Sequence, residues 1–382
     1  LGIAVPQATG IAILGDVFVS ALKAIAPLLV FFLVISSLCN AGKSHGGVIK
    51  TVIILYMFST VLAAVIAVFA SMAFPVKMTL ANAATDTSAP QGIVEVLNNL
   101  LLNVVANPVS SLVNANYVGI LMWAVLLGLA FRVADKMTKK VLADVADGIS
   151  MVVTWIINLA PFGIFGLVFN TVSTNGLDIF TTYGKLLILL VGCMLFIYFV
   201  TNPLLVYWCI RQNPYPLIFQ CLKRSALTAF FTRSSAANIP VNMKVCEEMG
   251  LDRDTYSVTI PLGATINMDG AAITITVMTM ATAFTLGIHV DIPTAIILSL
   301  LAALSACGAS GVAGGSLLLI PMACSLFGIS DDISMQVVAV GFIIGVVQDS
   351  VETALNSSSD LLLSASAEFR QWRLEGKEIK FK

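Results

Sequence analysis

Long apolar runs separated by short polar linkers dominate the chain. About 20 consecutive apolar residues cross a bilayer as a helix. Runs of this kind lie at 24–42, 51–76, 117–131, 149–177 and 186–210, with the first helix expected to begin near Leu14. Pro161 and Gly163 interrupt the fourth run, and Asn202 and Pro203 lie inside the fifth. The pattern predicts an all-α polytopic membrane protein.

Basic residues alternate between the linkers and predict the orientation of the chain. Lys and Arg gather at 43–50, 132–140, 211–253 and 370–382, and are rare at 77–116, 173–185 and 287–293. We expect the basic linkers and the C-terminus to be cytoplasmic. This topology requires a first helix that is mostly missing before Leu1, with its own N-terminus in the cytoplasm.

Composition narrows the class further. Hydrophobic residues make up 58% and charged residues 11%, against roughly 25% charged in soluble domains, and mean hydropathy is +0.96. This excludes a soluble enzyme, whose surface needs more charge. The net charge of −1 provides no basic surface for nucleic acid. The seven cysteines occur singly, which favours packing over disulfides or metal binding.

Two segments fit re-entrant hairpins better than simple spans. The first hairpin, 217–246, has a polar tip from Arg233 to Asn238 and basic residues on both sides. The second hairpin, 292–330, has no charge in 39 residues, and its centre, GASGVAGGS, is unfavourable for a helix. The charges predict that the first enters from the cytoplasm and the second from outside. Opposed hairpins are typical of secondary transporters.

Four carboxylates lie in apolar surroundings: Asp269, Asp349, Glu352 and Asp360. Each acid in a membrane costs roughly 2.5–3.5 kcal/mol. A helix places Asp349, Thr353, Asn356 and Asp360 on one stripe, with Glu352 at its edge. Arg233 can neutralise one acid. The remaining charge predicts cation binding rather than a polar stripe that only packs against another helix.

Backbone breaks supply further binding groups. The sequence GATINMDG, from Gly263 to Gly270, predicts local unwinding, so that carbonyls and Asp269 form an oxygen cage for Na⁺; the alternative is a simple kink. Half-helix N-termini at the hairpin tips favour an anionic group. The tips also offer the hydroxyls of Ser234 and Ser235, and the glycines Gly311, Gly314 and Gly315 allow close approach.

Four motifs in this order resemble the dicarboxylate/amino acid:cation symporter family, the glutamate transporter homologues. They are TRSSAANIP (232–240), PLGATINMDG (261–270), GASGVAGGS (308–316) and QDSVETALNSSSD (348–360). The closest branch is that of the bacterial sodium/serine-threonine symporters. The resemblance implies about eight transmembrane helices and two opposed hairpins. It also implies sodium-coupled import of serine, threonine or small neutral amino acids across the bacterial inner membrane, with no enzymatic activity and no organic cofactor.

The resemblance also implies roles for individual residues. Substrate binding is implied for Ser234, Ser235, Gly311, Gly315, Ser316, Asp349, Glu352, Thr353 and Asn356. Among these, Asp349 would bind the amino group. One sodium would take Asp360 and carbonyls of Gly263, Asn267 and Asn356; a second would take carbonyls of Thr265, Met268, Ala306, Cys307 and Ala309. A third would take Asp269 and Asn267 with Tyr56, Ser59 and Thr60.

Departures from the family pattern indicate the substrate class. Members that carry acidic amino acids have an arginine where this chain has Glu352, and a carboxylate there repels a second anionic group. Ala271 replaces a threonine of those members, and Ala313 replaces a usual proline. Ser316, where glycine is usual, offers a hydroxyl. These differences favour small neutral amino acids.

The resemblance further implies an elevator mechanism in a homotrimer. Residues 1–46 and 78–178 would form a fixed scaffold, 47–77 and 179–370 a mobile transport domain, and 371–382 a cytoplasmic tail. Only sodium-dependent stability of the closed states would convert this movement into coupled transport.

Two other classes of membrane protein compete with the transporter. Gly308 to Gly311 reads GASG, which matches the GxSG pattern of rhomboid-type intramembrane proteases. That chemistry needs a histidine base on a later helix, and no histidine follows His289. A channel needs a continuous pore, whereas two capped hairpins around an enclosed site fit alternating access better.

Overall fold

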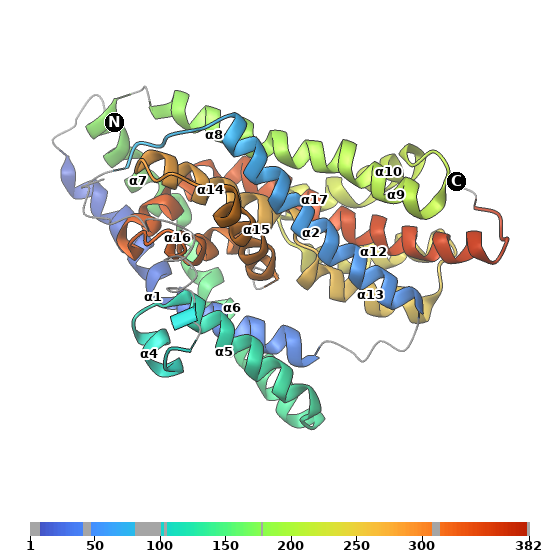
Figure 1. Cartoon of the computed structure of the whole chain (residues 1–382). Helices are drawn as coiled ribbons and strands as arrows, with labels where there is room; N and C mark the ends of the chain where they lie inside the picture. The colour runs from blue at the N-terminus through green and yellow to red at the C-terminus, as the bar shows by residue number, and fades with distance from the viewer. Residues whose placement is uncertain are drawn as a thin grey trace.

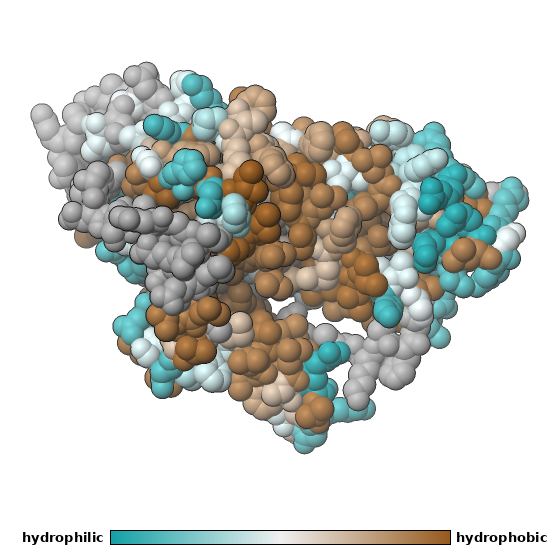
Figure 2. Space-filling model, in the orientation of Figure 1, coloured by the Kyte–Doolittle hydropathy of each residue, from teal (hydrophilic) through white to brown (hydrophobic). Residues whose placement is uncertain are grey.

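The computed structural model describes residues 8–40, 47–80, 101–102, 105–176, 179–307 and 314–379. Within these ranges every regular element is a helix, and six are long and apolar enough to cross a membrane: Ala12–Asn40, Gly47–Ala73, Lys136–Asn158, Phe180–Ile210, Arg253–Thr285 and Asp331–Leu374. Hydrophobic residues cover most of the visible face between hydrophilic ends (Figure 2). The prediction of an all-α polytopic membrane protein is confirmed.

The helices pack in two groups. The α1 group contains α1 (Ala12–Asn40), which packs on α5 (Tyr117–Ala130), α6 (Lys136–Asn158) and α7 (Ala160–Asn175), with α4 (Pro108–Val113) against α5. The next helix along the chain, α2 (Gly47–Ala73), instead packs on elements that follow residue 178. Figure 1 shows α4 and α5 beside α1 at the bottom of the view, and α2 crossing the larger body.

The α17 group contains α2 and the elements from α8 onward. These are α8 (Ile179–Phe196), the π-helical turn η3 (Ile197–Thr201), α9 (Asn202–Ile210), α10 (Tyr215–Cys221), the π-helical turn η4 (Leu222–Ala226), α11 (Leu227–Thr232), α12 (Ser235–Glu248), α13 (Arg253–Ile266), α14 (Asp269–Thr285), α15 (Ile292–Ala306), the 3-10 turn η5 (Gly315–Leu319), α16 (Ile320–Ser325) and α17 (Asp331–Leu374). The long helix α17 contacts most of them and forms the centre of this group.

The predicted start of the fourth span at Ile149 is wrong. The helix α6 begins at Lys136, and Asp135 caps it by accepting a hydrogen bond from Thr138 N at 2.7 Å. Its first turns are charged, so a search for apolar runs assigns them to a linker. The predicted interruption is confirmed: α7 begins directly after α6, with Pro161 in its first turn, where no backbone donor is needed.

Both hairpins have arms shorter than a membrane span. The first hairpin runs from α10 to α12 and turns at Arg233, whose φ of 49° is left-handed, and at the extended Ser234. The second hairpin descends through α15, whose 15 residues extend about 22 Å, and returns through η5 and α16. Its tip at 308–313 lies outside the described residues.

A close contact holds α7 against α1. A Cβ built on Gly163 would lie 2.3 Å from Cγ of Phe18. Phe18 is buried and also packs edge-on against Phe342 of α17, with ring centroids 5.2 Å apart. We therefore expect Gly163→Ala to destabilise the protein by about 1–3 kcal/mol, as overpacking does.

Thermal unfolding in detergent checks this expectation. Gly184→Ala on α8 is the matched control, since no atom of the described residues lies within 4 Å of a Cβ at that position. Both substitutions raise helix propensity equally, so only the contact with Phe18 distinguishes them. Equal melting temperatures of the two variants would contradict the expected clash.

Candidate functional site

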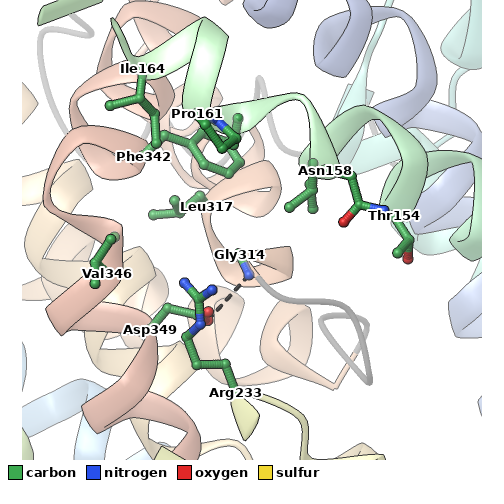
Figure 3. A pocket seen from close by; sticks show the side chains of 13 residues that line it. Thr154, Asn158, Pro161, Ile164, Arg233, Gly314, Leu317, Phe342, Val346 and Asp349 are labelled. Carbon is green, nitrogen blue, oxygen red and sulfur yellow. Dashed lines mark hydrogen bonds between the residues drawn. The ribbon is translucent and has the colours of Figure 1, made fainter. Parts of the chain in front are cut away.

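A cavity of about 540 Å³ lies between the α1 group and the α17 group. The α1 group supplies Thr154, Ile157, Asn158, Ala160, Pro161 and Ile164, and the α17 group supplies Arg233, Gly314, Leu317, Phe342, Gly345, Val346 and Asp349. Figure 3 shows Thr154 and Asn158 on the opposite side from Arg233 and Asp349. The cavity is therefore mainly apolar, with opposite charges at one side.

Asp349 and Arg233 give the cavity its charges. Both side chains line it beside Gly314 (Figure 3). Gly314 N donates a hydrogen bond to Asp349 Oδ1 at 3.1 Å, which joins the second hairpin to α17. Across the described part of the chain, no ion pair involves Arg233 or Asp349. Both charges are thus available to a ligand that carries both signs.

Other predicted substrate residues lie on the same hairpins and on α17 but are not among the residues that line the cavity. Ser234 Oγ accepts a hydrogen bond from Ala237 N at 3.2 Å and so caps α12. Asn356 Oδ1 accepts one from Gly270 N at 2.7 Å. Five further members of the set are buried: Ser235, Gly315, Ser316, Glu352 and Thr353. Gly311 lies outside the described residues. The structure thus brings the described members of this set to the two hairpins and the middle of α17.

The predicted unwinding between α13 and α14 is confirmed. Asn267 (φ −99°, ψ 84°) and Met268 (φ −122°, ψ 52°) both leave the helical region. Asn267 Nδ2 donates to Asp360 Oδ1 at 2.9 Å, while Asn267 Oδ1 is buried without a hydrogen-bond partner among the residues that the structure describes. An orphaned buried oxygen beside a buried carboxylate has the chemistry of a hard-cation site.

Gly263 and Tyr56 complete the surroundings of Asp360. A Cβ on Gly263 would lie 2.8 Å from Asp360 Oδ1, so only glycine leaves space for that carboxylate. Tyr56 donates its hydroxyl to the carbonyl oxygen of Asp360 at 2.8 Å. The resemblance assigned Tyr56 to the cluster around Asp269, but its hydroxyl lies with Asp360.

Asp269 forms a second oxygen cluster with α2. Ser59 Oγ donates to Asp269 Oδ2 at 2.8 Å, and Thr60 Oγ1 lies 3.3 Å from Asp269 Oδ1. Thr60 Oγ1 also accepts a hydrogen bond from Met268 N at 3.2 Å, which ties α2 to the unwound segment. All of these side chains are buried. The predicted grouping of Asp269 with Ser59 and Thr60 is thus present, whereas the amide of Asn267 turns to Asp360.

One contact bears on the remaining predicted oxygen ligands. Cys307 Sγ donates to the carbonyl of Ile266 at 3.7 Å, which places the end of α15 beside the unwound segment. Ala306 is buried there, and Thr265 donates its hydroxyl back to Leu262 O at 2.7 Å. Ala309 lies outside the described residues.

Sequence reasoning missed four polar residues near the site. Gln348 and Thr274 are fully buried and hydrogen-bond Glu352. Thr154 and Asn158 line the cavity from α6. The sequence spacing could have identified three of them. Gln348 lies four residues before Glu352, and Thr154 lies four residues before Asn158, so each pair shares a helix face.

The chain combines many apolar helices with buried carboxylates beside broken helices and a charged cavity. Together these features are those of a multi-pass membrane transporter. The chain matches the sodium:dicarboxylate symporter family over residues 1–368, and it belongs to this family.

Curated relatives are similar over almost the whole chain. A protein of Bifidobacterium adolescentis named serine/threonine transporter SstT is 58% identical over 380 residues, covering 99% of this chain and 88% of the relative. Two proteins of the same name from Streptococcus thermophilus strains are 55% and 56% identical, each covering 98% of this chain and 93% of the relative.

Proposed function

We propose that the chain is a secondary active transporter that imports serine and threonine together with sodium across the bacterial inner membrane. The observation that carries this proposal is that two opposite charges, Asp349 and Arg233, line one side of a mainly apolar cavity. The similarity to transporters named for serine and threonine supports the choice of substrate.

An amino acid at neutral pH is a zwitterion and matches these charges. Its ammonium group binds Asp349, and its carboxylate faces Arg233 and the N-terminus of α12 next to Ser234. The apolar walls and the carboxylate of Glu352 nearby disfavour an acidic side chain. Small neutral side chains therefore fit best.

Sodium ions bind the oxygen clusters around Asp360 and Asp269. Each cluster combines a buried carboxylate with hydroxyl, amide or carbonyl oxygens, the ligand set that hard cations prefer. Binding neutralises acids that are otherwise unfavourable in an apolar core. The unwound segment contacts both clusters, since Asn267 donates to Asp360 and Met268 N donates to Thr60. Gly270, directly after it, donates to Asn356 of α17, so occupancy of the clusters is coupled to the substrate region of α17.

Movement of the α17 group against the α1 group provides alternating access. In this proposal 47–77 and 179–370 form the transport domain, and 1–46 and 78–178 form the scaffold. The separate packing of the α1 group and the α17 group supports this division, as does the cavity between them. We further propose a homotrimer built on the scaffold, a cytoplasmic C-terminus, and hairpins that enter from opposite sides of the membrane. No organic cofactor takes part.

Uptake of radiolabelled serine into proteoliposomes tests this function. An inward sodium gradient should drive saturable serine accumulation that threonine inhibits and aspartate does not. Replacing Na⁺ by K⁺ or choline should reduce accumulation to the level of protein-free vesicles. Uptake that ignores the sodium gradient would contradict the symport. Flux that never saturates would favour a channel, and labelling of Ser310 by a fluorophosphonate would favour a protease.

A further inference from the structure

Glu352 lies three residues after Asp349 on α17 but does not line the cavity that Asp349 lines. It is nearly fully buried, and a single oxygen, Oε2, accepts hydrogen bonds from three side chains. The donors are Thr274 Oγ1 of α14 at 2.7 Å, Ser316 Oγ of η5 at 2.9 Å and Gln348 Nε2 of α17 at 2.5 Å. Gln348 Nε2 also donates to Thr274 Oγ1 at 2.7 Å.

We propose that Glu352 is a latch that fastens the returning arm of the second hairpin to α14 and α17 through Ser316. Gln348 and Thr274 act as positioning residues that aim the carboxylate at Ser316. The role of the latch in transport rests on the proposed function, because it requires the arm to move when the cavity exchanges its ligand.

Two hydrogen bonds join the described start of the returning arm to α17, and they differ in exposure to the cavity. Gly314 N donates to Asp349, which lines the cavity, whereas Ser316 donates to Glu352, which does not. A ligand ammonium group on Asp349 competes with Gly314 for the same carboxylate. The bond from Ser316 is shielded from that competition. While the latch is closed, the arm is therefore fixed at Ser316, and the segment at Gly314 responds to the ligand.

The backbone around the latch brings α14 close to α17. A Cβ on Gly270 would lie 3.0 Å from both Cα and Cγ of Glu352, so a larger residue would push the carboxylate away from its donors. A buried carboxyl group that loses a hydrogen-bond partner is left less well compensated in an apolar core. This favours an arm that stays closed while the cavity is empty.

The latch differs from a direct contact between Glu352 and the substrate hydroxyl. A substrate contact acts only when substrate is bound. The latch holds the arm in the empty protein, so its loss is measurable without serine and without sodium.

Hydrogen–deuterium exchange of the chain in lipid nanodiscs, with neither serine nor sodium present, tests the latch. We expect the amides of residues 315–325 to exchange about tenfold faster in Ser316→Ala than in wild type, because exchange tracks local opening. Ser325→Ala is the matched control on the same arm, since Ser325 Oγ donates to Met322 O within the arm itself, at 2.6 Å. It should exchange at the wild-type rate.

A double variant separates the latch from general loosening. If Ser316 acts through Glu352, Ser316→Ala combined with Glu352→Gln exchanges no faster than Glu352→Gln alone. Fully additive acceleration would overturn the pairing, and wild-type exchange in Ser316→Ala would overturn the latch. If Glu352→Gln does not fold, the comparison of exchange rates between Ser316→Ala and Ser325→Ala still tests the latch. If the wild-type protein does not take up serine, the proposed function is contradicted. The exchange comparison still tests the latch, because it uses neither serine nor sodium.

Discussion

Asp349→Asn lowers sodium-driven serine uptake, expressed as kcat/KM, by about 100-fold. The substitution keeps the shape of the side chain and removes the charge that binds the ammonium group. Removing one member of a buried charge pair costs roughly 2–5 kcal/mol, and each 1.4 kcal/mol is tenfold. Asparagine also retains an oxygen that can accept the hydrogen bond from Gly314 N, so the hairpin contact is preserved.

Initial uptake rates over a range of serine concentrations measure the effect. Ser350→Ala is the matched control on the adjacent position of α17, because the hydroxyl of Ser350 donates to Val346 O within its own helix at 2.8 Å. It should transport like wild type. An Asp349→Asn variant with the wild-type KM and rate would remove Asp349 from the substrate site.

Hydropathy predicted the helical class because a bilayer imposes a minimum length of apolar helix. It failed at α6, whose first turns carry Lys136, Lys139 and Lys140 and so look like a linker. Local chemistry also predicted the break at Asn267, where the sequence Asn-Met-Asp-Gly opposes a continuous helix in an apolar span. These features depend on neighbouring residues, which a single sequence contains.

Contacts across the chain could not be predicted in the same way. Gln348 and Thr274 are 74 residues apart in sequence and meet only when α14 packs on α17. The same packing turns Tyr56 toward Asp360 and fills the hydrogen-bonding capacity of Glu352 Oε2 with protein donors. A charge pattern could identify Glu352 as important but could not distinguish a group facing the cavity from one holding a hairpin.

The sodium dependence of transport provides the second large effect. We expect Asp360→Asn to raise the half-saturating sodium concentration for serine uptake by about tenfold or more. The substitution keeps the side-chain volume beside Gly263, where a close contact leaves little tolerance. It removes the negative charge that offsets the dehydration of a cation, a loss of at least about 1.4 kcal/mol for a tenfold change.

Two readouts assign this effect to ion binding rather than to folding. Sodium should raise the melting temperature of wild type, because a ligand that binds the native state stabilises it, and the same rise in Asp360→Asn should need more sodium. Glu375→Gln is the carboxylate control, since Glu375 follows the last turn of α17 and pairs with Lys377 at 2.7 Å. An Asp360→Asn variant with unchanged sodium dependence in both readouts would exclude Asp360 as a sodium ligand. If Asp360→Asn still binds serine at high sodium concentration, the cation site at Asp360 is separate from the substrate site at Asp349. This is the expected result, because the two residues are eleven positions apart on α17.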